Sequence, residues 1–147
     1  MKTLRSTTTV RVSSVLLALL MLLALCACAP KNPDTAALWE EATYTRDKTF
    51  GTGATTIEVE VKAGEKSVTF TIKTDKTVLA DALLEHQLVA GEDSAYGLYV
   101  KRVNGILADY DVNGSYWALS QNGTSLMSGV SGVTIADGAH YELVYTK

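Results

Sequence analysis

Apolar and polar residues alternate strictly over residues 56–62, and the same alternation returns over residues 67–73. Ile57, Val59 and Val61 occupy every second position of the first segment, with charged residues between them. A period of two places the apolar side chains on one face of a strand, so each segment is predicted to be a half-buried strand. Residues 63–66 supply a turn, and the two strands therefore predict a β-hairpin.

At Asp75 the period changes from two to that of a helix. Asp75 is a candidate N-cap, and Gly91 follows as a stop signal. The apolar stripe of the predicted helix consists of Val78, Leu79, Ala82 and Leu83, with His86 as a further candidate at its end.

The second half of the chain is strand-like and interrupted by three Asn-Gly pairs, at residues 104–105, 113–114 and 122–123. Asn-Gly favours tight turns because both residues tolerate a positive φ. We therefore expect a meander of short strands, ending in a strand over residues 140–146 with Tyr141, Leu143 and Tyr145 on one face. A hairpin, one helix and a meander predict an α+β, β-grasp-like domain with the helix packed on a mixed sheet.

The N-terminus has the pattern of a bacterial lipoprotein signal peptide. Lys2, Arg5 and Arg11 precede an apolar run over residues 15–25, which is about half the roughly 20 residues that span a bilayer as a helix. Leu25 and Ala27 stand at the positions that a lipoprotein signal peptidase reads before Cys28. We expect cleavage after residue 27, a lipid anchor on Cys28, and a mature protein at the outer face of the bacterial cytoplasmic membrane or the cell surface.

Removal of residues 1–27 leaves 120 residues, enough for one domain, with ten basic and sixteen acidic side chains and a net charge of −6. Such a surface disfavours nucleic acid as a partner. Cys28 is the one cysteine that remains, so no disulfide or cysteine metal cluster is expected. Residues 28–53 are interpreted as a lipidated tether, with helical turns over 36–41, a short strand over 42–45 and Trp39 packed on the domain; residues 54–147 are the predicted domain.

Two motifs suggest chemistry, and neither is complete. Asp109, Asp111 and Asn113 match the opening of a calcium loop, but Ser120 stands where the loop needs its closing glutamate, which favours a hydrogen-bonded turn. Residues 129–132 resemble a nucleophile elbow around Ser131, but Val133 replaces the last glycine. No complete set of acid, base and nucleophile exists, so we expect a protein that is not an enzyme.

Aromatic rings are concentrated in the second half of the chain. Amphipathic rings suit a flat apolar ligand with polar edges, although strand alternation must bury about half of them. Tyr116 and Trp117 are neighbours in one predicted strand, so one of the two must face the core. The rings are Tyr96, Tyr99, Tyr110, Tyr116, Trp117, Tyr141 and Tyr145.

Over residues 56–147 the chain resembles the bacterial domain of unknown function DUF4430, which is similar to the C-terminal β-domain of transcobalamin and intrinsic factor. The matching stretches are residues 77–85, 97–105, 115–119, 125–130 and 135–143. In those carriers the β-domain closes over one face of cobalamin, while a larger helical domain, absent here, holds the other. The resemblance implies corrinoid contacts at Tyr96, Tyr99, Tyr116, Trp117, Leu126 and Met127.

The leading hypothesis is a membrane-anchored binding module that captures cobalamin, another corrinoid or a similar flat ligand and passes it to a membrane importer, without a covalent cofactor. Half of a clamp buries less ligand, so tight binding needs a partner. The alternative is a cell-surface interaction module that binds a protein or a cell-wall polymer through exposed strands and takes no small ligand.

Overall fold

Strands β2 (Thr55–Ala63) and β3 (Lys66–Thr74) form the predicted hairpin in the computed structural model, which describes residues 33–147. The two strands are antiparallel, and their register pairs Ile57 with Ile72 and Val61 with Val68. These apolar side chains are buried, whereas the residues between them point to the other face of the sheet. The alternation read from the sequence is therefore confirmed.

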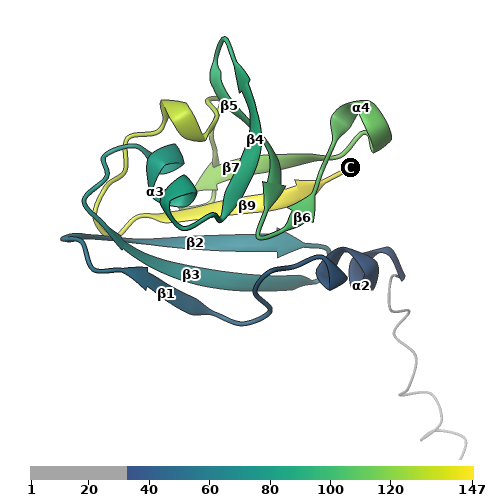
Figure 1. Ribbon diagram of the computed structural model, residues 1–147, viewed down its shortest axis with the longest axis horizontal. Helices are drawn as coiled ribbons and strands as arrows, with labels where there is room; N and C mark the ends of the chain where they lie inside the picture. Colours follow the sequence, from purple (N-terminus) through teal and green to yellow (C-terminus); the bar gives the residue numbers. More distant parts are fainter. Residues whose placement is uncertain (1–32) are drawn as a thin grey trace, which may run out of the picture. The chain divides into compact units, whose positions relative to one another are not determined.

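The hairpin belongs to a six-stranded mixed sheet with the order β1-β3-β2-β9-β7-β8 (Figure 1). Strands β2 and β9 are parallel neighbours at its centre, and β7 pairs antiparallel with β9. The further strands of this sheet are β1 (Lys48–Gly51), β7 (Tyr116–Gln121), β8 (Thr124–Ser125) and β9 (His140–Thr146).

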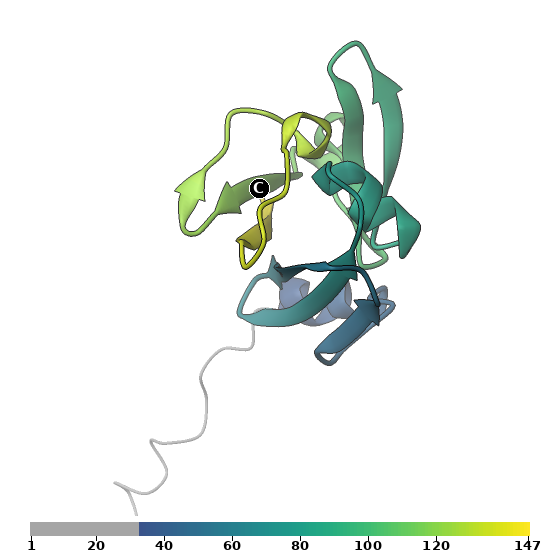
Figure 2. The ribbon, with the colours of Figure 1, turned by 90° about the vertical axis from the view of Figure 1, so that its left-hand side faces the viewer.

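The meander does not stay in one sheet. Strands β4 (Val89–Ser94), β5 (Gly97–Val103) and β6 (Ile106–Leu107) form a separate three-stranded antiparallel sheet. The β4–β5 hairpin extends away from the larger sheet in both views (Figures 1 and 2). Two Asn-Gly pairs make the hairpin turns β5–β6 and β7–β8, with positive φ at both residues; in the third, Gly114 ends the short helix α4 (Tyr110–Asn113).

Helix α3 (Leu79–Glu85) buries Leu79, Ala80, Ala82 and Leu83, which confirms the predicted stripe at Leu79, Ala82 and Leu83; Val78 and His86 flank the helix. The predicted N-cap is wrong, because Val78 precedes the helix and has no side-chain capping bond. The Asp75 carboxylate instead accepts a hydrogen bond from Ala54 N at 2.9 Å. The α+β class is confirmed: the fold has two sheets, and helix α3 packs its apolar stripe into the core.

The segment before the hairpin folds onto the domain. Helix α2 (Pro33–Glu40) carries the buried Trp39, whose Nε1 donates to Ala63 O at 2.9 Å. The strand expected over residues 42–45 lies instead at β1, which pairs parallel with β3. Aromatic contacts attach this segment to the domain, because Tyr44 and Phe50 make edge contacts with Phe70, with ring centroids 5.8 and 5.7 Å apart.

The predicted signal peptide and Cys28 lie outside the described residues. Among residues 33–147, no helix combines the length and apolar character that a membrane span requires.

Candidate functional site: a groove between the two sheets

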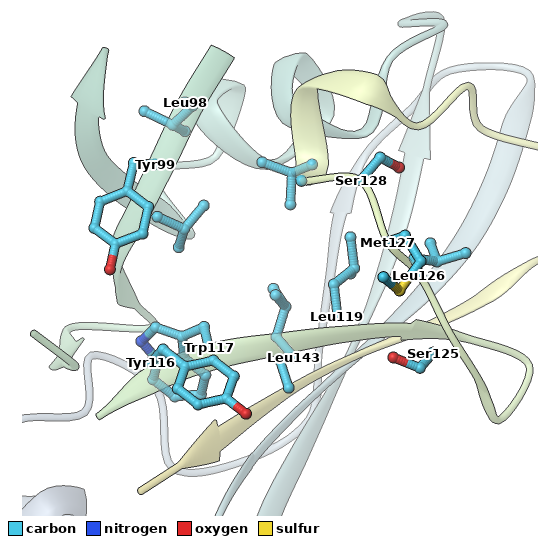
Figure 3. Close-up of a pocket in the computed structure, with 14 residues that line it drawn as sticks. Leu98, Tyr99, Tyr116, Trp117, Leu119, Ser125, Leu126, Met127, Ser128 and Leu143 are labelled. Carbon is cyan, nitrogen blue, oxygen red and sulfur yellow. The ribbon is translucent and has the colours of Figure 1, made fainter. Parts of the chain in front are cut away.

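Strands β5 and β7 belong to different sheets and enclose a groove of about 350 Å³ (Figure 3). Residues 125–130, between β8 and the 3₁₀ helix η2 (Val130–Gly132), form its other wall. Tyr99, Tyr116 and Trp117 lie at one end, Leu126 and Met127 at the other, and the floor lies between them (Figure 3). The lining residues are Leu98, Tyr99, Val100, Tyr116, Trp117, Ala118, Leu119, Ser125, Leu126, Met127, Ser128, Gly129, Val130 and Leu143.

The floor of the groove is the inner face of β7 and β9. Leu119 and Leu143 are buried there and pair across the strands. Trp117 is 9% exposed and packs its ring edge-on against Tyr145, with ring centroids 5.7 Å apart. Its indole Nε1 is buried and has no hydrogen-bond partner among the described residues. A buried donor without a partner normally costs stability.

The rim is exposed and adaptable. Tyr99 and Tyr116 are each 43% exposed, and Met127 is fully exposed. Tyrosine offers an apolar ring with a polar tip, and the flexible thioether of methionine adjusts to irregular surfaces. A rim of this composition can hold an apolar ligand that has polar edges.

Five of the six residues expected to contact a ligand line this one groove: Tyr99, Tyr116, Trp117, Leu126 and Met127. The sixth, Tyr96, lies in the turn between β4 and β5, is 95% exposed and does not line the groove. The fold thus brings together positions from three separate parts of the sequence and leaves Tyr96 outside.

Backbone contacts hold the walls in place. Leu126 N donates to Leu119 O at 2.9 Å, and Leu98 N donates to Ser131 Oγ at 3.0 Å. Gly97 has φ +94°, and a Cβ at this residue would stand 2.4 Å from Ser131 Cβ. Ser131, the centre of the elbow-like motif, therefore connects η2 to β5 through this contact, which is a structural role.

The groove is electrically neutral. Its lining contains no Asp, Glu, Lys, Arg or His from the described residues. The nearby Lys101 ammonium lies 6.0 Å from the Tyr99 ring centre but is bound to Glu92 at 2.8 Å and Asp109 at 3.3 Å. The hydrogen bond to Glu92 raises the pKa of Lys101, and the contacts with Asp109 raise it further. The Lys101 charge is therefore paired with these two carboxylates.

The calcium-like residues form a capped helical turn. Asp109 precedes α4 and accepts from Asp111 N at 3.1 Å, and its second oxygen contacts Lys101. Asn113 Oδ1 accepts from Ser115 N at 3.0 Å. Asp109 and Asn113 thus use side-chain oxygens to accept hydrogen bonds within a turn. This is the hydrogen-bonded turn that the incomplete calcium motif predicted.

A second cluster lies on the outer face of the larger sheet. Glu60, His140 and Glu142 place one potential metal-ligand atom each within 4.8 Å of one another. Sequence reasoning missed this cluster, because the sequence does not show that β2 pairs with β9 some 80 residues later. The one sequence signal for this cluster is the alternation of polar and apolar residues, which places Glu60 and Glu142 on the polar faces of their strands.

Comparisons with known proteins identify one family and two similar solved structures. The family model described as "Domain of unknown function (DUF4430)" matches residues 75–147. A candidate metal binding protein from Ruminococcus gnavus ATCC 29149 is similar in structure, with 28% sequence identity, a TM-score of 0.60, and coverage of 63% of this chain and 97% of that one. Haptocorrin in complex with Cbi shows 18% identity and a TM-score of 0.49, over 67% of this chain and 26% of haptocorrin. The search of curated proteins found no match.

Proposed function

We propose that this protein, whose residues 75–147 form a DUF4430 domain, is a non-catalytic binding module that captures a flat amphipathic molecule, with a corrinoid as the leading candidate. The observation that carries the proposal is the convergence of aromatic and apolar side chains around one uncharged groove. Lipidation at Cys28 would hold the module at the outer face of the cytoplasmic membrane, with residues 1–27 removed as a signal peptide.

The size of the groove supports a ligand that is held on one side. Sites for small molecules measure about 300–1,000 Å³ and usually bury most of the ligand. A groove of about 350 Å³ is at the lower end of that range and is too small to enclose a corrinoid. The module would cover one face or one edge of such a ligand, and a membrane importer would cover the rest during transfer.

The composition of the groove supports binding over catalysis. Among the described residues, its lining has no carboxylate, imidazole or amine that could act as a general base or activate Ser125 or Ser128. The description of the Ruminococcus gnavus protein as a candidate metal binding protein is also that of a binder.

A β-grasp arrangement is the finer interpretation of the fold. It is supported by the hairpin β2–β3, the helix that follows it, and the parallel pair of β2 and β9 between antiparallel neighbours. The proposed domain comprises residues 54–147, and residues 28–53 are its proposed N-terminal extension.

An interaction module is the second candidate function. Strand β8 pairs only with Ser120 and Gln121 of β7, so among the described residues Tyr116–Ala118 have no strand partner on that side. An open strand beside an apolar groove can accept an extended peptide by β-augmentation. This candidate predicts binding of a peptide and no affinity for a flat ring.

Titration of the full-length protein in detergent tests the proposal. The chain is titrated by calorimetry with cyanocobalamin and cobinamide, and haem serves as the flat-ring control. The Tyr116→Ala and Met127→Ala variants remove exposed rim side chains, so they should weaken corrinoid binding about tenfold each and leave the melting temperature unchanged.

Tyr110→Ala is the matched control, since Tyr110 is an exposed tyrosine that does not line the groove. It should bind as the wild type does. Corrinoid affinity that is equal in wild type, Tyr116→Ala and Met127→Ala would contradict the placement of the site, and equal affinity for haem would contradict corrinoid selectivity.

A further inference from the structure

Four polar side chains lie together at the centre of the larger sheet, on the face opposite the groove. Strands β2 and β9 are parallel neighbours, and their register pairs Glu58 with His140 and Glu60 with Glu142. Because alternate residues face opposite sides of a strand, all four side chains point to the outer face, while Tyr141 and Leu143 point inward. Adjacent central strands hold side chains more precisely than loops do.

The distances from His140 Nε2 are compatible with ligands that share one metal ion. His140 Nε2 lies 3.4 Å from Glu60 Oε2 and 3.9 Å from Glu142 Oε1. Two ligand atoms bound to one tetrahedral Zn²⁺ at about 2.0–2.2 Å are separated by about 3.4 Å. The separation of His140 Nε2 and Glu60 Oε2 matches this value, and all three candidate ligand atoms lie within 4.8 Å of one another.

Each of the three candidate ligands is oriented by a partner on its other polar atom. Glu58 Oε2 lies 3.3 Å from His140 Nδ1, and Lys62 Nζ lies 3.4 Å from Glu60 Oε1. The Ser120 hydroxyl donates to Glu142 Oε2. The atoms left over, His140 Nε2, Glu60 Oε2 and Glu142 Oε1, are those that converge. A carboxylate on the far nitrogen of a metal-binding histidine fixes the tautomer that leaves Nε2 free to coordinate.

The local charge also favours a cation. Glu58, Glu60 and Glu142 surround the imidazole, and Lys62 is the one cation among the described residues that forms an ion pair with them.

We propose that Glu60, His140 and Glu142 bind one divalent transition-metal ion of the zinc class. The side chains of these residues are 17%, 31% and 23% exposed, so water can reach a fourth coordination position. The imidazole nitrogen selects this class over Ca²⁺ and Mg²⁺, which prefer oxygen ligands only. The site lies on the opposite face from the groove, and it does not depend on the identity of the groove ligand.

Calorimetric titration with ZnCl₂ tests the site. The full-length chain carries Cys26→Ser and Cys28→Ser, so that no thiol competes, and has no polyhistidine tag; it is stripped with EDTA and studied in detergent. We expect one equivalent of Zn²⁺ to bind and to raise the melting temperature, with MgCl₂ producing no comparable signal.

Isosteric variants locate the ion. His140→Gln and Glu142→Gln should each weaken Zn²⁺ binding about 100-fold or more, and Glu58→Gln should weaken it about 10- to 100-fold through the orientation of His140. Glu65→Gln, in the exposed β2–β3 turn, is the matched control and should bind as the parent does. Absence of saturable binding in the parent, or equal affinity in parent and His140→Gln, would overturn the proposal. Zn²⁺ binding in a chain that does not bind corrinoids would support the metal site and contradict only the function proposed for the groove.

Discussion

The groove and the outer-face cluster are built from opposite faces of the same strand. β9 contributes Leu143 to the floor of the groove and His140 and Glu142 to the cluster. The period of two along a strand is sufficient to separate an apolar surface from a polar one within four residues. The comparison shows how a small domain can carry two recognition surfaces that share no side chain.

The two surfaces differ in how firmly they are held. The groove has walls from two sheets and from residues 125–130, with an exposed rim, so its shape can adjust to a ligand. The cluster stands on two hydrogen-bonded neighbours in one sheet, where relative displacement is small. We therefore expect a tolerant groove and a geometrically selective cluster.

Trp117→Ala should have the largest effect on this comparison. Trp117 forms the floor of the groove and is almost fully buried, so loss of the ring should cost about 3–5 kcal/mol of unfolding free energy. Urea unfolding measures the loss, and Trp117→Phe, which retains an aromatic ring, should lose less. An unfolding midpoint equal to that of the wild type would show that Trp117 is not part of the core.

Gly97→Ala should damage the groove without changing any lining residue. The new Cβ would meet Ser131 and push η2 from β5. Gly123→Ala is the matched control, because Gly123 has φ +79° and nothing within 4 Å of its added Cβ. Both variants lose about 1–2 kcal/mol to backbone strain, and Gly97→Ala should lose a further 1–3 kcal/mol, roughly, from overpacking. Equal losses in urea unfolding would contradict this account of the wall.

Combining Tyr116→Ala with His140→Gln should show that the two surfaces are independent. Each change should weaken only its own ligand, and the double variant should show the sum of the two single effects, within about 0.5 kcal/mol. Calorimetry with cobinamide and with ZnCl₂ measures both affinities on one sample. Coupling well beyond that limit would mean that β7 and β9 transmit a change from one site to the other.

Glu60→Gln should have the smallest effect, visible only in the pH dependence of stability. The pKa of Glu60 is lowered from its ordinary value of 4.5, so ionised Glu60 stabilises the fold above that pH. This contribution is lost as the pH falls through the lowered value. In EDTA, the wild type should therefore lose more unfolding free energy on acidification than Glu60→Gln does. Parallel pH profiles for the two proteins would contradict the assignment, and Glu65→Gln serves as the control.

Local patterns predicted most of the secondary structure. The β2–β3 hairpin and β9 follow directly from alternation, and α3 from its stripe of Leu79, Ala82 and Leu83. Errors arose where tertiary contacts decide the outcome. Asp75 binds the backbone of Ala54 rather than capping α3, and the first strand forms at Lys48–Gly51, where Phe50 reaches Phe70.

The candidate site was predictable only in part. Tyr99, Tyr116, Trp117, Leu126 and Met127 were expected through the family resemblance, and the structure places them around one groove. The exposure of Tyr96 depends on a hairpin that leaves the larger sheet, which periodicity does not reveal. The metal-ligand cluster depends on the parallel register of β2 and β9, and no local pattern specifies a pairing over that separation.

The most direct test of the binding proposal is a two-dimensional amide NMR titration of the full-length protein in detergent with cobinamide. We predict saturable shift changes at residues 98–100, 116–119 and 125–130, which line the groove, and unchanged amides on the polar turn at Gly64 and Glu65. No saturable change, or changes confined to residues outside the groove, would contradict the account.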